Sequence, residues 1–135
     1  MKKKTRDYGS PACTLHEFEP GVRIKRVYEE PAATDGFRVL VDRLWPRGLT
    51  RKKAALDAWA KDIAPTPALR KWFGHEPERF AEFRERYRAE LRGHRDEIAV
   101  LHERAKQQPV TLLYGARDPT VNHATVLREV IRRSR

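Results

Sequence analysis

Residues 110–133 read VTLLYGARDPTVNHATVLREVIRR, and the prediction of the fold rests mainly on this segment. Its first part, residues 110–114, is an apolar run with the length of one strand. Residues 115–119 are turn formers, and the apolar residues after Thr120 recur at helical spacing. In α/β proteins, ligands bind at such junctions, beyond the carboxyl end of a strand and beside a helix N-terminus. The stretch therefore predicts a strand, a tight loop and a helix, with a site at the loop.

A second strand is predicted at residues 37–41, FRVLV, and it runs directly into the polar loop 42–48, DRLWPRG. The residues between this strand and the strand at 110–114 have mostly helical periodicity, so they form a crossover connection. Two apolar strands joined by a helical crossover are expected to lie side by side and parallel. The predicted fold is therefore α/β, a small single domain with a mostly parallel sheet flanked by helices.

Other elements follow from the same patterns. Residues 22–28 alternate apolar and basic, which predicts a half-buried strand. The gap before the next strand is too short for a parallel crossover, so the two strands are either a hairpin or non-neighbours. Apolar spacing predicts a helix over residues 51–63, a short helical turn over 68–73, and helix over 77–107 interrupted near Gly93.

Composition places the chain among basic proteins of one domain. It has 135 residues, 36% of them charged, and a formal net charge of +10. Such a surplus favours an anionic partner, such as a phosphate-bearing small molecule or a nucleic acid. Much of the arginine is mixed with glutamate, as in residues 78–92, and a solvated helix face has the same pattern. We therefore rank nucleic acid second to an anionic small molecule.

Several classes of protein are not expected. Cys13 is the only cysteine and the five histidines are scattered, so neither an internal disulfide nor a metal site is expected. No apolar run is long enough to span a membrane, and the basic N-terminus lacks the apolar segment of a secretory signal. We expect a cytoplasmic protein. The sequence specifies neither a cofactor nor an oligomeric state.

Two loops carry the candidate site residues. Asp42 and His123 are the candidates for catalysis, since a histidine and an aspartate can act as general base and orienting group. The candidate ligand-binding residues are Arg43, Trp45, Arg47, Tyr114, Arg117, Asp118 and Asn122. Arginines and a helix N-terminus can hold a phosphate or carboxylate, so we expect a cleft between the strand-end loops 42–48 and 114–123.

Each candidate also has a structural interpretation. Asp42 can pair with a nearby arginine, and Trp45 can cover the core. Asp118 before a proline fits a helix N-cap, and Asn122 can serve the same cap. His123 can hydrogen-bond a carbonyl group of a neighbouring loop.

The segments 37–48 and 110–124 together resemble the domain of unknown function 488 (DUF488) family, in particular its YeaO-like branch. The resemblance extends over about residues 24–133 and rests on both motifs, in this order, around a helical insert rich in Trp and Phe. It implies a small α/β domain with the two motifs on neighbouring strand ends.

The wider family pattern implies which site residues are shared. It has Asp-Val-Arg after the first strand, and Cys-Ala-Glu followed by Cys-His-Arg after the second. Asp42 and His123 match directly, whereas Arg43 lies one position earlier than the family arginine. The cysteines are replaced by Tyr114 and Asn122, the glutamate by Ala116 and the last arginine by Ala124. Thiol or carboxylate chemistry based on those groups is therefore excluded here.

Residues 1–20 are expected to be a loosely ordered tail on a domain formed by residues 21–135, because they show no sustained periodicity. Deletion of this tail should therefore leave the fold intact. Thermal unfolding followed by circular dichroism checks this. A melting temperature lowered by many degrees would show that the tail packs on the domain.

Overall fold

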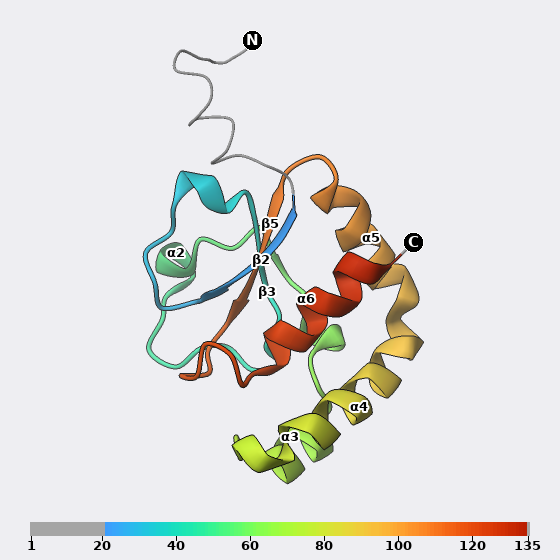
Figure 1. Ribbon diagram of the computed structural model, residues 1–135. Helices are drawn as coiled ribbons and strands as arrows, with labels where there is room; N and C mark the ends of the chain where they lie inside the picture. The colour runs from blue at the N-terminus through green and yellow to red at the C-terminus, as the bar shows by residue number, and fades with distance from the viewer. Residues whose placement is uncertain (1–20, 135) are drawn as a thin grey trace.

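The computed structural model describes residues 21–134, which form a four-stranded, fully parallel sheet with helices around it (Figure 1). The tail lies outside the described residues, so its expected looseness stays a prediction. The strands are β2 (Gly21–Arg26), β3 (Phe37–Leu40), β4 (Ala58–Trp59) and β5 (Pro109–Tyr114). The predicted α/β class is confirmed.

Strand β5 lies in the middle of the sheet, whose order is β2-β5-β3-β4. Its Leu112 pairs with Ile24 of β2 on one side and with Val39 of β3 on the other. The predicted parallel pairing of the strands at 37–41 and 110–114 is therefore confirmed. Since β5 separates β2 from β3, these two strands are non-neighbours and the hairpin alternative is wrong.

The helix predicted over residues 51–63 is wrong beyond its first turn. Helix α2 (Arg51–Ala54) ends at Ala55, which adopts the left-handed conformation with φ of 50°. The chain then forms strand β4, in which Trp59 pairs with Leu40. Pairing with the open edge of β3 satisfies backbone groups that a continued helix would have left exposed. Tertiary pairing thus overrides the local helical periodicity.

The remaining helices agree with the predicted pattern, with the interruption near Gly93 formed by a 3₁₀ turn. None of the helices in residues 21–134 could span a membrane. Their bounds and those of the 3₁₀ turns are η1 Ala33–Asp35, η2 Lys61–Ile63, α3 Pro67–Phe73, η3 Pro77–Arg79, α4 Phe80–Leu91, η4 Arg92–His94, α5 Arg95–Ala105 and α6 His123–Arg133.

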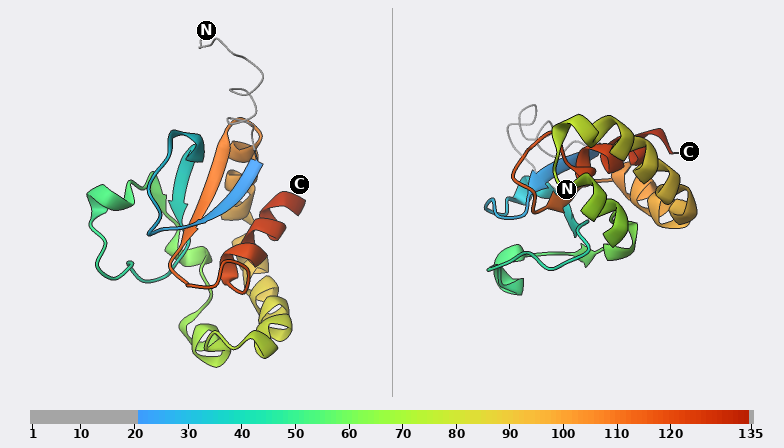
Figure 2. Two further views of the ribbon diagram at one scale, coloured as in Figure 1. Left: turned by 60° about the vertical axis from the view of Figure 1, so that its left-hand side comes forward. Right: turned by 90° about the horizontal axis from the view of Figure 1, so that it is seen from below.

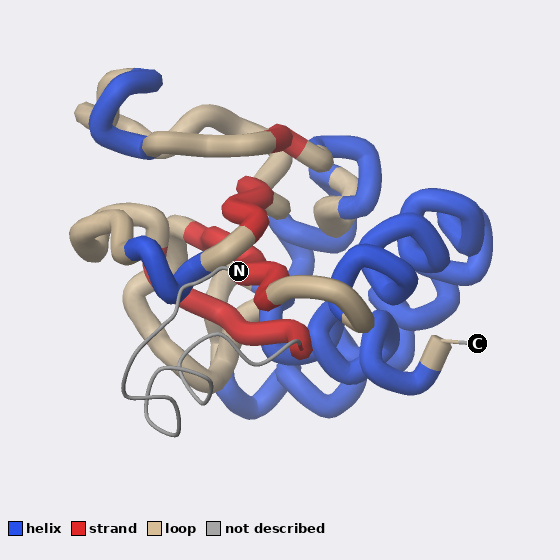
Figure 3. Tube along the Cα trace, turned by 90° about the horizontal axis from the view of Figure 1, so that it is seen from above, coloured by secondary structure: helices blue, strands red, loops and turns tan. Residues whose placement is uncertain are grey.

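The two faces of the sheet are covered unequally (Figures 2 and 3). Helices α4, α5 and α6 cover one face, where Val110, Leu112 and Tyr114 of β5 enter the main core. The opposite face, toward α2, receives Leu113, which joins a smaller cluster, and Thr111. This alternation follows from the two-residue period of a strand. Most of the apolar burial therefore lies on the helical side.

A charged cluster is buried on the face of the sheet opposite α4, α5 and α6. Asp35 lies 2.5 Å from Nη1 of Arg38 and 3.1 Å from Nζ of Lys25, and its carboxylate also accepts the N–H of Ala32 at 2.9 Å. Thr111 Oγ1 donates to the Asp35 carbonyl at 2.7 Å. Burial alone would raise the pKa of Asp35, but the backbone and cationic donors outweigh it and lower the pKa below the usual 3.8.

The cluster predicts a pH-dependent contribution to stability. Because the pKa of Asp35 is lowered in the folded state, its contribution is present above pH 3.8 and is lost as the pH falls further. Asp35→Asn should lower the free energy of unfolding by about 3 kcal/mol at pH 7, since it leaves buried cations unpaired. Urea denaturation at pH 7 and pH 3 should show this difference shrinking in acid.

The matched control for this experiment is Asp62→Asn. Asp62 is exposed and makes no hydrogen bond or ion pair within residues 21–134. It should behave like the parent at both pH values. A difference between Asp35→Asn and the parent that stays constant with pH would contradict the role assigned to the ionised carboxylate.

Candidate functional site

A cavity of about 490 Å³ opens at the carboxyl edge of the sheet. In Figure 1 this edge points downward, with the start of α6 beside the tip of β5 and α3 below. The cavity is walled by the loop after β3, the loop after β5, the first residue of α6 and the segment around α3. Its position agrees with the expected cleft between the two strand-end loops, although α3 adds a wall that the sequence did not predict.

Asp42 ties together the ends of the sheet at the cavity floor. Its Oδ2 accepts the N–H of Gly115, at 2.9 Å, just beyond β5. Its main-chain carbonyl accepts the indole N–H of Trp59 in β4 at 2.7 Å. Glycine at position 115 favours this approach, because a Cβ there would lie 3.0 Å from Asp42 Oδ2, a tighter contact than most side chains make. Asp42 therefore fixes the relative positions of three strand ends.

His123, the first residue of α6, contacts the same point. Its Nε2 lies 3.0 Å from the Val41 carbonyl and 3.0 Å from Asp42 Oδ1. Both neighbours are acceptors, so Nε2 must carry the hydrogen. The hydrogen-bond geometry favours the carbonyl, and Asp42 Oδ1 makes only the charge contact. A proton transfer by His123 would therefore have to use Nδ1, the nitrogen with no partner among the described residues.

The candidate catalytic pair is thus in direct contact, and part of its role is structural. The side chains of Asp42 and His123 are 21% and 15% exposed. The alternative interpretation of His123, a bond to a carbonyl of a neighbouring loop, is also confirmed, since Val41 lies in the loop directly after β3. Catalysis by the pair stays a proposal.

Two side chains hold the wall at residues 63–65. Arg43 donates to the carbonyls of Ala64 and Pro65 at 3.0 and 3.2 Å. The hydroxyl of Tyr87, in α4, donates to the Ile63 carbonyl at 2.5 Å. Burial raises the pKa of Tyr87 well above its ordinary value, so the phenol remains a donor. Arg43 is therefore a wall-forming residue, although its guanidinium borders the cavity.

The cationic side chains that are free to bind a ligand in the cavity come from other positions. Arg47, Arg70 and Lys71 line it, are exposed, and have side chains without a hydrogen bond or ion pair within residues 21–134. Arg47 was predicted from the sequence. Arg70 and Lys71 were not, because on a short helix they look like solvated residues, and only the position of α3 brings them to the cavity.

Trp45 and Asn122 line the cavity in supporting roles. The Trp45 indole donates to the Leu49 carbonyl at 2.6 Å and its ring packs edge-on against Trp59. Asn122 is the N-cap of α6, since its Oδ1 accepts the N–H of Thr125 at 3.1 Å. The structural interpretations of both residues therefore hold, alongside their contact with the cavity.

The three remaining candidates lie away from the cavity. Tyr114 points into the helical core, where burial raises the pKa of its hydroxyl. Arg117 is exposed on the loop. Asp118 accepts the N–H groups of Thr120 and Val121 at 2.8 and 2.9 Å, so it caps the turn before α6 rather than the helix itself. Proximity in sequence did not bring these three together with Asp42.

The described part of the chain contains no group of three His, Cys, Asp or Glu side chains that could hold a metal ion.

The sequence of the chain matches a known protein family. The family described as the inactive DUF488-N3 subclade matches residues 21–134. The chain belongs to the DUF488 family. The uncharacterised protein YeaO of Escherichia coli is 50% identical over 111 residues, covering 82% of this chain and 96% of that protein. The uncharacterised protein Rv3073c of Mycobacterium tuberculosis is 41% identical over 113 residues, covering 84% of this chain and 95% of that protein. No solved structure matches.

Membership of the YeaO-like DUF488 proteins confirms the resemblance drawn from the two motifs. In this DUF488 domain, Asp42 and His123, which match the wider family pattern, meet at one point. Tyr114, at the place of the family's first cysteine, instead faces the core. Of the substituted positions, Ala116 and Asn122 line the cavity, whereas Tyr114 does not.

Asp42→Asn should lower the free energy of unfolding by about 1–3 kcal/mol, because an amide cannot accept from Gly115 while also offering a negative oxygen to His123. Urea denaturation measures the change, with Asp62→Asn again as the control. Unchanged stability in Asp42→Asn would show that the strand ends are held without this carboxylate.

Proposed function

We propose that this DUF488 domain binds a phosphate- or carboxylate-bearing small molecule in the cavity at the carboxyl edge of the sheet. The observation that carries the proposal is the convergence of Arg47, Arg70 and Lys71 on one cavity with their charges unpaired by described residues. Guanidinium and ammonium groups are the side chains that recognise such anions. The cavity volume of about 490 Å³ suits a small molecule.

Binding is favoured over covalent catalysis. Within residues 21–134, the side chains that line the cavity include no serine, threonine or cysteine to act as nucleophile. Asp42 and Nε2 of His123 are engaged by Gly115 and Val41, which leaves Nδ1 as the free nitrogen of the histidine. The matched subclade is itself described as inactive. The Asp42–His123 pair then serves to shape the floor of a binding site.

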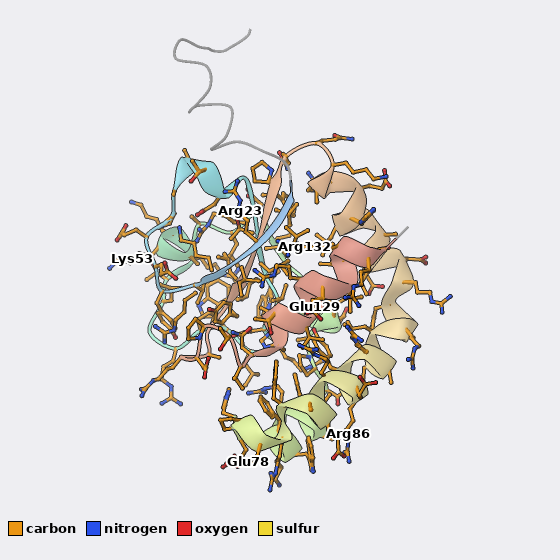
Figure 4. All side chains as sticks on the ribbon, viewed as in Figure 1. Arg23, Lys53, Glu78, Arg86, Glu129 and Arg132 are labelled. Atoms are coloured by element: carbon orange, nitrogen blue, oxygen red, sulfur yellow. The ribbon has the colours of Figure 1, made fainter. Side chains whose placement is uncertain are left out.

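The second candidate, a nucleic-acid-binding domain, rests on the +10 charge. Its expected signature is a continuous basic face away from the strand ends. On α4 and α6, basic side chains are mixed with acidic ones, and Arg86 of α4 and Glu129 and Arg132 of α6 are labelled in Figure 4. Arg88 pairs with Glu129 at 3.2 Å, and Arg86 pairs with Glu82. This mixing supports a small anion over a polynucleotide.

Isothermal titration calorimetry with orthophosphate, pyrophosphate and ribose 5-phosphate tests the proposal. Arg47→Ala and Arg70→Ala should each weaken binding about tenfold, the usual effect of losing a charged hydrogen bond. Their melting temperatures should stay close to the parent value, because neither side chain holds another part of the fold. Arg95→Ala is the matched control, since Arg95 is exposed on α5 and does not line the cavity.

Two results would contradict the proposal. One is the absence of binding by all three phosphate compounds. The other is an equal loss of affinity in Arg47→Ala and Arg95→Ala. If a single-stranded oligonucleotide binds and the phosphate compounds do not, the nucleic-acid alternative replaces it.

A further inference from the structure

The mouth of the cavity carries exposed apolar side chains as well as charge. Among the large apolar residues of the described chain, three are exposed, and two of these, Tyr28 and Leu44, line this cavity. They are 41% and 62% exposed. Single exposed apolar residues are ordinary, but two at the mouth of a cationic cavity form a surface suited to an apolar part of a ligand.

Tyr28 is held in a fixed orientation. Its hydroxyl donates to the Arg47 carbonyl at 2.9 Å, which links it to the loop after β3. The guanidinium of Arg26 lies over the ring, 4.7 Å from its centroid. Arg26 is itself anchored, since its Nε donates to the Ala116 carbonyl at 2.9 Å. An aromatic ring fixed at both its edge and its face loses little entropy when a ligand packs against it.

The same contact couples the ring to the cations. Since Tyr28 is bonded to the backbone of Arg47, the ring lies beside the residue whose free guanidinium faces the cavity. Tyr28 and Arg47 both line the cavity, so a ligand bound through a phosphate at Arg47 can also contact the ring. Aromatic rings stack on tyrosine, and Tyr28 remains 41% exposed although Arg26 lies over its ring.

We infer that the ligand is a phosphate ester that carries a planar aromatic ring, such as a mononucleotide, and that Tyr28 is the residue that recognises the ring. This inference rests on the proposed phosphate-binding function. Inorganic phosphate and simple sugar phosphates occupy only the cationic part of the site.

Calorimetry with two probes that differ only in the ring tests this inference. AMP and ribose 5-phosphate share the sugar and the phosphate, and only AMP has a base. The parent protein should bind AMP about tenfold more tightly than ribose 5-phosphate, the usual gain from stacking one base. Tyr28→Leu should bind the two compounds with similar affinity, because the base then has no ring on which to stack.

Tyr28→Phe is the matched control. It keeps the ring and removes the hydroxyl that bonds to the Arg47 carbonyl, so it should retain most of the preference for AMP. A loss of preference in Tyr28→Phe equal to that in Tyr28→Leu would assign the effect to the loop contact, and the stacking role would be wrong.

The outcomes distinguish a failure of this inference from a failure of the proposed phosphate binding on which it rests. If ribose 5-phosphate binds and AMP binds no more tightly, the aromatic contact is wrong while phosphate binding stands. If neither compound binds, phosphate binding itself is wrong, and the inference fails with it. Circular dichroism of each variant confirms that the fold is retained.

Discussion

The carboxylate of Asp42 is the contact on which the carboxyl edge of the sheet depends. Asp42 lies two residues after the end of β3, accepts the N–H of the first residue after β5, and contacts the first residue of the last helix. Parallel strands end at a common edge, but their loops diverge unless a polar group joins them. A carboxylate can accept from several donors at once, which makes it suited to this place.

The polar groups that hold the walls of this cavity are different from those that are free to contact the proposed ligand. Arg43 and Tyr87 donate to main-chain carbonyls of residues 63–65 and so hold a wall in position. Arg47 and Arg70 have no such partner among the described residues, yet they line the same space. Rigid walls carrying free cations are the arrangement expected of a preorganised anion site.

Charge plays a different part on the opposite face of the sheet. There Arg38 and Asp35 are buried together, and Arg38 also donates to the carbonyls of Ala54 and Ala55 at 2.7 and 3.0 Å. These hydrogen bonds connect the end of α2 to β3. On the opposite face of the sheet, apolar packing of the helices makes the corresponding contacts. A high content of charged residues in this protein thus reflects structure as well as solvation.

The strands at 22–28, 37–41 and 110–114 and the final helix could be predicted from the sequence alone, and so could the choice of Asp42 and His123 as site residues. These features depend on local periodicity and on which residues follow a strand. Three features could be seen only in the tertiary structure. Strand β5 lies between β2 and β3, and Trp59 belongs to a strand. Arg70 and Lys71 face the site, while Tyr114 does not. Such outcomes depend on pairing between distant segments and on which side of a strand a residue takes, and neither is encoded in short-range spacing.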